Sequence, residues 1–190
     1  MMKRPHFPKD EWQYRDRSSA LVRSTLLRLT FEFVVAARGI PGVVRIAILG
    51  SLVTDKSRPK DADVLVTIKN DADLERLAHA GRRFQGRAQE INSTADIFLA
   101  DTSSQYLGRI CHYRECWPRV RCLARHCGAR PHVNNDLDVV SLSAIQIASP
   151  PLVVYPYSEP SVTVPNDVIE LLLRPLRNSD SAAALIVCPA

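Results

Sequence analysis

Several features that would place this protein in a familiar class are missing from its 190 residues. No apolar run approaches the roughly 20 consecutive residues of a membrane-spanning helix. The segment 1–11 is basic but has no apolar region behind it, so it lacks the pattern of a signal peptide, and we expect a cytoplasmic protein with no membrane partner. The sequence also has no internal repeat, no phosphate-binding P-loop sequence and no Ser-His-Asp arrangement.

Aromatic residues are scarce at 6%, but the hydrophobic content of 46% is enough for an ordinary packed core. The length suits one domain with appendages. The net charge is +5, and residues 150–190 carry −2, so the rest of the chain carries +7. Such an excess suits a partner that bears phosphates, with a solvated basic surface as the alternative.

Apolar periodicity predicts an α/β (α+β) domain over 18–149, between an N-terminal arm (1–17) and a Pro-rich C-terminal extension (150–190). The arm could become helical near Asp10, and a first helix is predicted from Ser18 or Ser19 to Gly39, with Val22, Leu26, Leu29 and Phe33 as its apolar stripe. Short runs rich in Val and Ile predict strands at Val43–Leu49, Asp63–Ile68, Ala95–Ala100 and Leu137–Leu142.

A second helix is predicted after Asn70, which can cap it, with Leu74, Leu77, Ala78, Gly81 and Phe84 as its stripe. Arg76, Arg83 and Arg87 fall together on another face of that helix. Such a row is usually a solvated face, and contact with a substrate is the alternative. Five prolines over 149–165 predict an extended linker or wrapping segment, and a last short helix is expected from Pro165 to Leu173, stopped by Pro175.

The most informative stretch joins an apolar run ending at Gly50-Ser51 to a second run that begins with Asp61 and Asp63. Successive strand side chains point to opposite faces, so these two carboxylates would project from the same face. Two adjacent carboxylates repel each other, and a cation bound between them offsets that repulsion. Asp96, on the next predicted strand, supplies a third carboxylate.

Gly50-Ser51, Asp61-Ala62-Asp63 and Asp96, in this order over residues 43–100, resemble the core signature of the DNA-polymerase-β-like nucleotidyltransferase superfamily. The resemblance implies a small mixed sheet flanked by helices, with Asp61, Asp63 and Asp96 as catalytic ligands of Mg²⁺. Gly50 and Ser51 would face the phosphates of an NTP, usually ATP. Minimal members of the superfamily often follow the Gly-Ser pair with a small residue, Arg and Gly. This turn continues Leu52-Val53-Thr54-Asp55 instead, so Lys56 or Arg58 would supply the positive charge.

The reaction that the resemblance implies is transfer of a nucleoside monophosphate to a hydroxyl on a small molecule, a protein or an RNA end. Members of this kind often serve in toxin–antitoxin pairs or antibiotic modification. The alternative is a catalytically degenerate binding module on the same scaffold, stabilised by zinc, that recognises nucleic acid or a protein partner.

Four of the five cysteines cluster over 109–132, with four, five and four residues between Cys111, Cys116, Cys122 and Cys127. Four thiolates, or three with His126 or His132, would hold a structural Zn²⁺, and buried free cysteines are the alternative. The same segment is rich in arginine, with aromatic residues interleaved, so it could present guanidinium and aromatic surfaces to RNA or hold a triphosphate.

Overall fold

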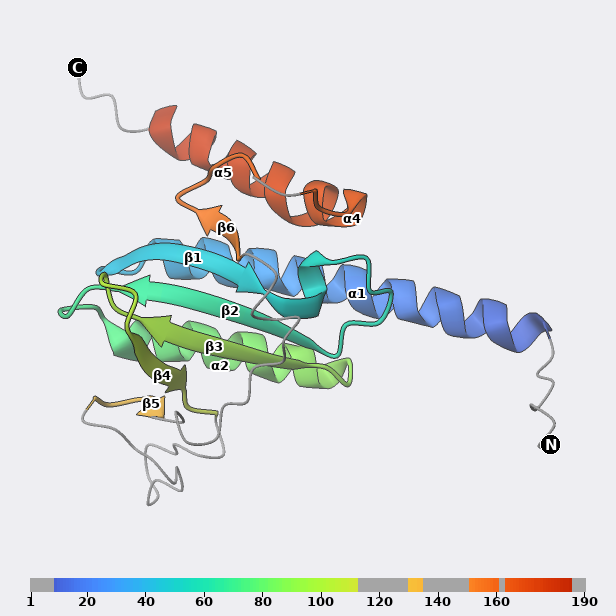
Figure 1. Ribbon diagram of the computed structural model, residues 1–190, viewed down its shortest axis with the longest axis horizontal. Coiled ribbons are helices and arrows are strands. Elements are labelled where there is room, and N and C mark those ends of the chain that lie inside the picture. Colours follow the sequence, from blue (N-terminus) through green and yellow to red (C-terminus); the bar gives the residue numbers. More distant parts are fainter. Residues whose placement is uncertain (1–8, 113–129, 135–150, 161–162, 186–190) are drawn as a thin grey trace.

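The computed structural model describes residues 9–112, 130–134, 151–160 and 163–185, and these form an α+β fold around one mixed sheet (Figure 1). The strands run in the order β5-β4-β3-β2-β1-β6. Their bounds are β1 Val43–Leu49, β2 Asp61–Ile68, β3 Thr94–Ala100, β4 Tyr106–Ile110, β5 Val133–Asn134 and β6 Leu152–Tyr155. The helical elements are α1 Lys9–Arg38, the 3₁₀ turn η1 Gly50–Val53, α2 Leu74–Glu90, α4 Asn166–Val168, the π segment η2 Ile169–Leu173 and α5 Arg174–Leu185.

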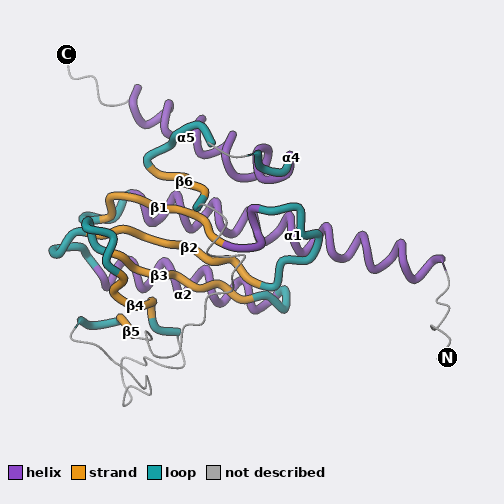
Figure 2. The backbone as a smooth tube through the Cα atoms, viewed as in Figure 1, coloured by secondary structure: helices purple, strands orange, loops and turns teal. Residues whose placement is uncertain are grey.

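Both long helices, α1 and α2, lie on the same face of the sheet (Figures 1 and 2). Alternate strand residues such as Ile48, Val64 and Ile97 point to that face and are fully buried. Gly81 of α2 packs so closely on this face that an added Cβ would lie 3.2 Å from Ile97 Cδ1. The intervening residues, among them Asp63, therefore point to the opposite face, which no helix covers in the described part of the chain.

β2 and β3 pair in parallel, whereas β1 pairs with β2, and β3 with β4, in antiparallel fashion. The end of β1, the starts of β2 and β3 and the end of β4 therefore meet at one end of the sheet. The predicted strands at Val43–Leu49 and Ala95–Ala100 are confirmed to within a residue, and the second strand begins two residues earlier than predicted, at Asp61.

Both helix starts differ from the prediction. The first helix begins at Lys9, close to Asp10 where the arm could become helical, and it runs unbroken past the start predicted near Ser18. The second helix begins after Asp73, not Asn70, and the Asp73 carboxylate accepts a hydrogen bond from the Arg76 amide at 3.0 Å. Residues 69–73 are held by backbone hydrogen bonds to the turn at 41–42, so the helix cannot start earlier.

Three described strands were not predicted. β4 ends inside the Cys/His-rich segment 109–132, and the two-residue β5 follows directly after that segment. β6 forms part of the predicted Pro-rich linker, and it pairs with β1 at the edge of the sheet. Proline is tolerated beside an edge strand, and Val153 and Val154 have high strand propensity. The strand predicted at Leu137–Leu142 lies outside the described residues.

The last helix was predicted to stop at Pro175. In the structure it continues through α5 to Leu185. Pro175 cannot donate to the carbonyl four residues before it, which lies in η2. The wider π turn of η2 accommodates this missing bond. Leu172 and Leu176 are fully buried in the same core as α1 and β6. Within the described ranges, no helix is long and apolar enough to cross a membrane.

Candidate functional site

The three candidate carboxylates lie on adjacent parallel strands at one end of the sheet. Asp63 of β2 is in register with Asp96 of β3, and Asp61 is in register with Thr94. Paired residues on neighbouring strands point to the same face, and the strands are about 4.8 Å apart, so all three carboxylates share the face opposite α1 and α2. Asp63 is only 8% exposed. The structure thus places Asp61, Asp63 and Asp96 on one face at one end of the sheet.

The Gly50–Ser51 turn lies beside these carboxylates, because Leu49 at the end of β1 pairs with Asp63. Gly50 has a φ of 68°, a left-handed conformation that glycine adopts without steric cost. The Ser51 hydroxyl is buried and has no hydrogen-bond partner among the described residues. An unsatisfied buried hydroxyl costs about 1–3 kcal/mol, so the turn carries a donor that a bound group would satisfy.

Asp96 has a protein partner that the sequence did not suggest. His112 Nε2 lies 2.8 Å from Asp96 Oδ1, and about 30% of each side chain is exposed. His112 follows β4, whose antiparallel pairing with β3 returns the chain to the carboxylate end of the sheet. Because β4 was not predicted, this histidine could not be placed beside Asp96 from the sequence.

The donor atoms suit magnesium, since carboxylate oxygens are the ligands that this hard cation prefers. In the conformation described, however, no three His, Cys, Asp or Glu side chains within the described ranges converge closely enough to hold a metal ion. One oxygen of Asp96 is directed to His112 instead. The site therefore has donor atoms of the type that a hard cation prefers, but in the described ranges they do not converge as the ligands of a metal site.

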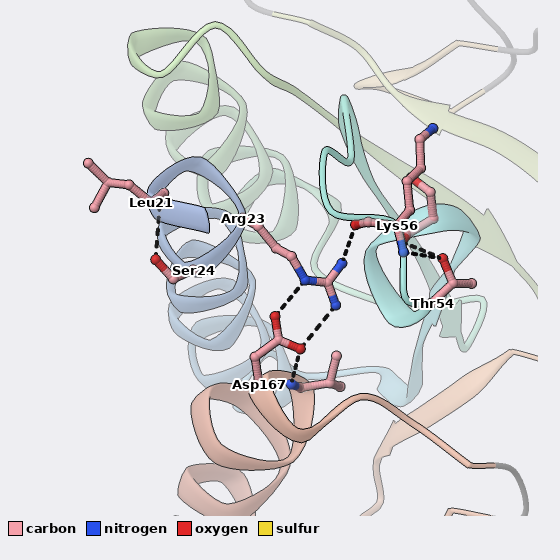
Figure 3. A network of polar contacts seen from close by, with 8 residues as sticks. Leu21, Arg23, Ser24, Thr54, Lys56 and Asp167 are labelled. Atoms are coloured by element: carbon pink, nitrogen blue, oxygen red, sulfur yellow. Dashed lines mark hydrogen bonds and ion pairs between the residues drawn. The ribbon is translucent and has the colours of Figure 1, made fainter. Parts of the chain in front are cut away.

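The loop between η1 and β2 is fixed by a polar network that starts on α1 (Figure 3). Arg23, only 7% exposed, forms a two-point ion pair with Asp167, with Nε 2.5 Å from Oδ2 and Nη2 3.1 Å from Oδ1. The remaining Arg23 nitrogen, Nη1, donates to the Lys56 carbonyl at 2.9 Å. The hydrogen bond from Arg23 holds the pKa of Asp167 below its ordinary value, although partial burial acts in the opposite direction.

The side chains of Lys56 and Arg58 are exposed in that loop. The loop begins with Thr54, whose hydroxyl donates to the Ser51 carbonyl at 2.9 Å and accepts from the Lys56 amide at 3.4 Å. These bonds connect the loop to the Gly50–Ser51 turn. Arg23 and Asp167 were not among the predicted site residues, because nothing in the sequence joins two positions that are 144 residues apart.

Of the four predicted zinc ligands, only Cys111 is described, and it is buried. Cys116, Cys122, Cys127 and His126 lie outside the described residues. Arg82 of α2 donates to the Cys111 carbonyl at 3.4 Å and to His132 Nδ1 at 3.2 Å. Burial, followed by the charge of Arg82, lowers the pKa of His132, which agrees with a neutral ring that accepts this bond.

A model of a family of unknown function, DUF6932, matches residues 7–129, about two thirds of the chain, and the protein belongs to this family. The match includes every predicted catalytic and nucleotide-binding residue, and it ends before β5, β6 and the C-terminal helices. No curated protein matches the chain. No solved structure matches it either.

Proposed function

We propose that this protein is a Mg²⁺-dependent nucleotidyltransferase of the DNA-polymerase-β-like type. It would move a nucleoside monophosphate from an NTP, with ATP as the first candidate, to a hydroxyl on a small molecule, a protein or an RNA end. The observation that supports the proposal is the register of Asp63 with Asp96 beside the Gly50–Ser51 turn. A fold gains nothing from placing like charges on neighbouring strands, whereas a cation makes the arrangement favourable.

Asp61, Asp63 and Asp96 would hold the magnesium, which supplies positive charge that neutralises the triphosphate and the leaving pyrophosphate. The residues of the turn bind the nucleotide in this proposal. Gly50 has no Cβ to obstruct the approach of a phosphate, and the Ser51 hydroxyl donates to a phosphate oxygen. Lys56 and Arg58 are exposed in the next loop and add positive charge.

In the transfer step, the acceptor oxygen bonds to the α-phosphorus while the bond from that phosphorus to the pyrophosphate oxygen breaks. Asp96 takes the proton of the acceptor hydroxyl. His112 holds Oδ1 of that carboxylate and so fixes its orientation toward the acceptor. Charge neutralisation and positioning account for most of the catalysis in reactions of this kind.

One observation favours a second candidate, a catalytically degenerate binding module. Asp96 is engaged by His112, and no three potential ligands converge within the described part of the chain. Such a module would keep the scaffold, take structural zinc at the cysteine segment, and recognise nucleic acid or a protein. It predicts zinc in the purified protein and RNA binding that is sensitive to salt and independent of Asp61 and Asp63.

The test is transfer of label from α-³²P-labelled NTPs into cell extract with Mg²⁺, together with calorimetric binding of Mg²⁺-ATP. We expect Asp61→Ala with Asp63→Ala to abolish transfer and to weaken binding. Asp71→Ala removes an exposed carboxylate after the other end of β2, so it is the matched control and should leave both unchanged. Transfer that survives the double substitution would rule out this site, and RNA binding without transfer would favour the second candidate.

A further inference from the structure

A groove of about 370 Å³ runs between α1 and α2 on the outer side of the helical layer, away from the carboxylate face. Its floor is apolar, because small side chains on both helices, including Ala36 and Ala80, leave space over a stacked aromatic pair. The rings of Phe33 and Phe84 lie 5.2 Å apart with an interplanar angle of 15°. The groove can therefore accept a few apolar side chains.

The rim of the groove is basic. Arg76, His79, Arg83 and Arg87 line it from α2, and Glu32 lines it from α1. Glu32 is already paired with Arg87. The side chains of Arg76 and Arg83 are exposed and have no hydrogen bond or ion pair with any other residue that the structure describes. At Arg76 and Arg83 the rim thus presents positive charge that has no acidic partner among the described residues.

The row of basic residues on α2 is long enough to contact a helical or extended protein segment. Arg76 and Arg87 are eleven positions apart on α2, which at about 1.5 Å per residue places them about 16 Å from each other along the helix axis. About three turns of a partner helix cover the same length. A nucleic acid would bring polar phosphates to the rim but would leave the apolar floor without a matching surface.

We propose that this groove is a docking site for an acidic amphipathic segment of a protein partner. Apolar side chains of that segment would fill the hollow over Ala36 and Ala80, and its carboxylates would pair with Arg76 and Arg83. The groove lies on the helical face, so the partner would leave the carboxylate face open. The proposal is independent of the reaction at that face.

The probe is a fluorescein-labelled synthetic helix of about 18 residues, with leucines at helical spacing and glutamates on both sides of the leucine stripe. An isomer with the same composition but no leucine stripe controls for charge alone, and a single-stranded RNA of equal length controls for phosphate binding. Anisotropy titrations of the full-length protein give the affinities. The striped helix should bind at least about tenfold more tightly than either control, since about 1.4 kcal/mol of extra burial and pairing suffices for that ratio.

Two kinds of variant test the site. Arg76→Glu with Arg83→Glu reverses the rim charge, and Ala36→Trp fills the hollow from an exposed helix position without changing any charge. Each should weaken binding of the striped helix by about tenfold. Arg28→Glu reverses an exposed charge on α1 outside the groove and should change the affinity less than about twofold.

Circular dichroism establishes that each variant is folded. If the charge reversal disturbs the fold, Ala36→Trp alone tests the groove. Equal affinity for the striped helix and its isomer would overturn the proposal, because only charge would then be recognised. It would also be overturned if Arg28→Glu weakened binding as much as the groove variants. RNA binding that is lost in the charge-reversed variant, without peptide binding, would assign the groove to nucleic acid instead.

Discussion

The pair formed by Arg23 and Asp167 gives a quantitative prediction, because Asp167 supplies the one carboxylate that pairs with the buried guanidinium in the described part of the chain. Asp167→Asn keeps the size of the side chain but removes that charge. Breaking a fully buried ion pair costs about 3–5 kcal/mol. The Asp167 side chain is 37% exposed, and solvent there screens part of the interaction. We therefore expect the free energy of unfolding to fall by about 1–3 kcal/mol at neutral pH.

The pH dependence gives an independent check on the same pair. Arg23 lowers the pKa of Asp167 from its ordinary value of 3.8. A carboxyl group whose pKa is lower in the folded state contributes stability above its unfolded pKa and loses it as pH falls through the folded value. The difference between wild type and Asp167→Asn should therefore be constant at neutral pH and shrink below about pH 4.

Urea denaturation at pH 7 and at several acidic pH values measures the loss of stability and its pH dependence. Arg23→Met is the second variant of the double-mutant cycle. With the guanidinium removed, Asp167→Asn should cost little, so the double-mutant cycle should show a coupling of at least about 1 kcal/mol. The reasoning would be refuted if the single substitution changed stability by less than about 0.5 kcal/mol. A difference that does not shrink in acid would refute it equally.

Two further predictions concern the strands and turns near the site. Gly108→Ala should destabilise the protein by about 2–4 kcal/mol in a urea melt, because φ is 118° and the new Cβ would lie 2.3 Å from the Asn134 carbonyl oxygen. The matched control is Gly86→Ala on α2, where nothing lies within 4 Å; it should be neutral or stabilising by up to about 1 kcal/mol, and equal losses at the two positions would contradict the argument. Burial and Arg82 lower the pKa of His132 from 6.5, so the unfolded chain binds this proton more readily and stability should fall as pH drops through about 6.5. His132→Asn tolerates the positive φ of 67° and should flatten that slope, whereas an unchanged slope would assign the titration to another group.

The central strands could be predicted because their apolar residues alternate or cluster over seven or eight positions. That pattern put Asp61 and Asp63 on one predicted strand and Asp96 on the next, and the family resemblance grouped the three. The parallel pairing that puts Asp63 in register with Asp96 is known only from the structure. β5 has two residues and β6 has four, and both are too short to carry a period. Gly108 interrupts β4, and prolines flank β6, so composition favoured loops at both places.

The residues around the carboxylates were harder to predict, because they reach the site through long-range pairing. His112 comes to Asp96 only because β4 returns antiparallel to β3, so the missed strand also concealed the histidine. Arg23 was predicted to lie on a helix and off its apolar stripe, which is typical of a solvated residue. Its burial results from η2 packing against α1 and from the ion pair with Asp167 of α4, and no local sequence pattern predicts those contacts.

The C-terminal segment matters to the candidate site although the family match ends at residue 129. β6 pairs with β1, the strand that leads into Gly50, and Asp167 neutralises the arginine that holds the Lys56 carbonyl. A chain ending at residue 129 would leave the β1 edge unpaired and Arg23 buried without this counter-charge. Both losses fall on the turn and loop proposed to hold the triphosphate. The Pro-rich C-terminal segment, which the sequence predicted to be an extension outside the domain, therefore stabilises the turn and loop that carry the proposed chemistry.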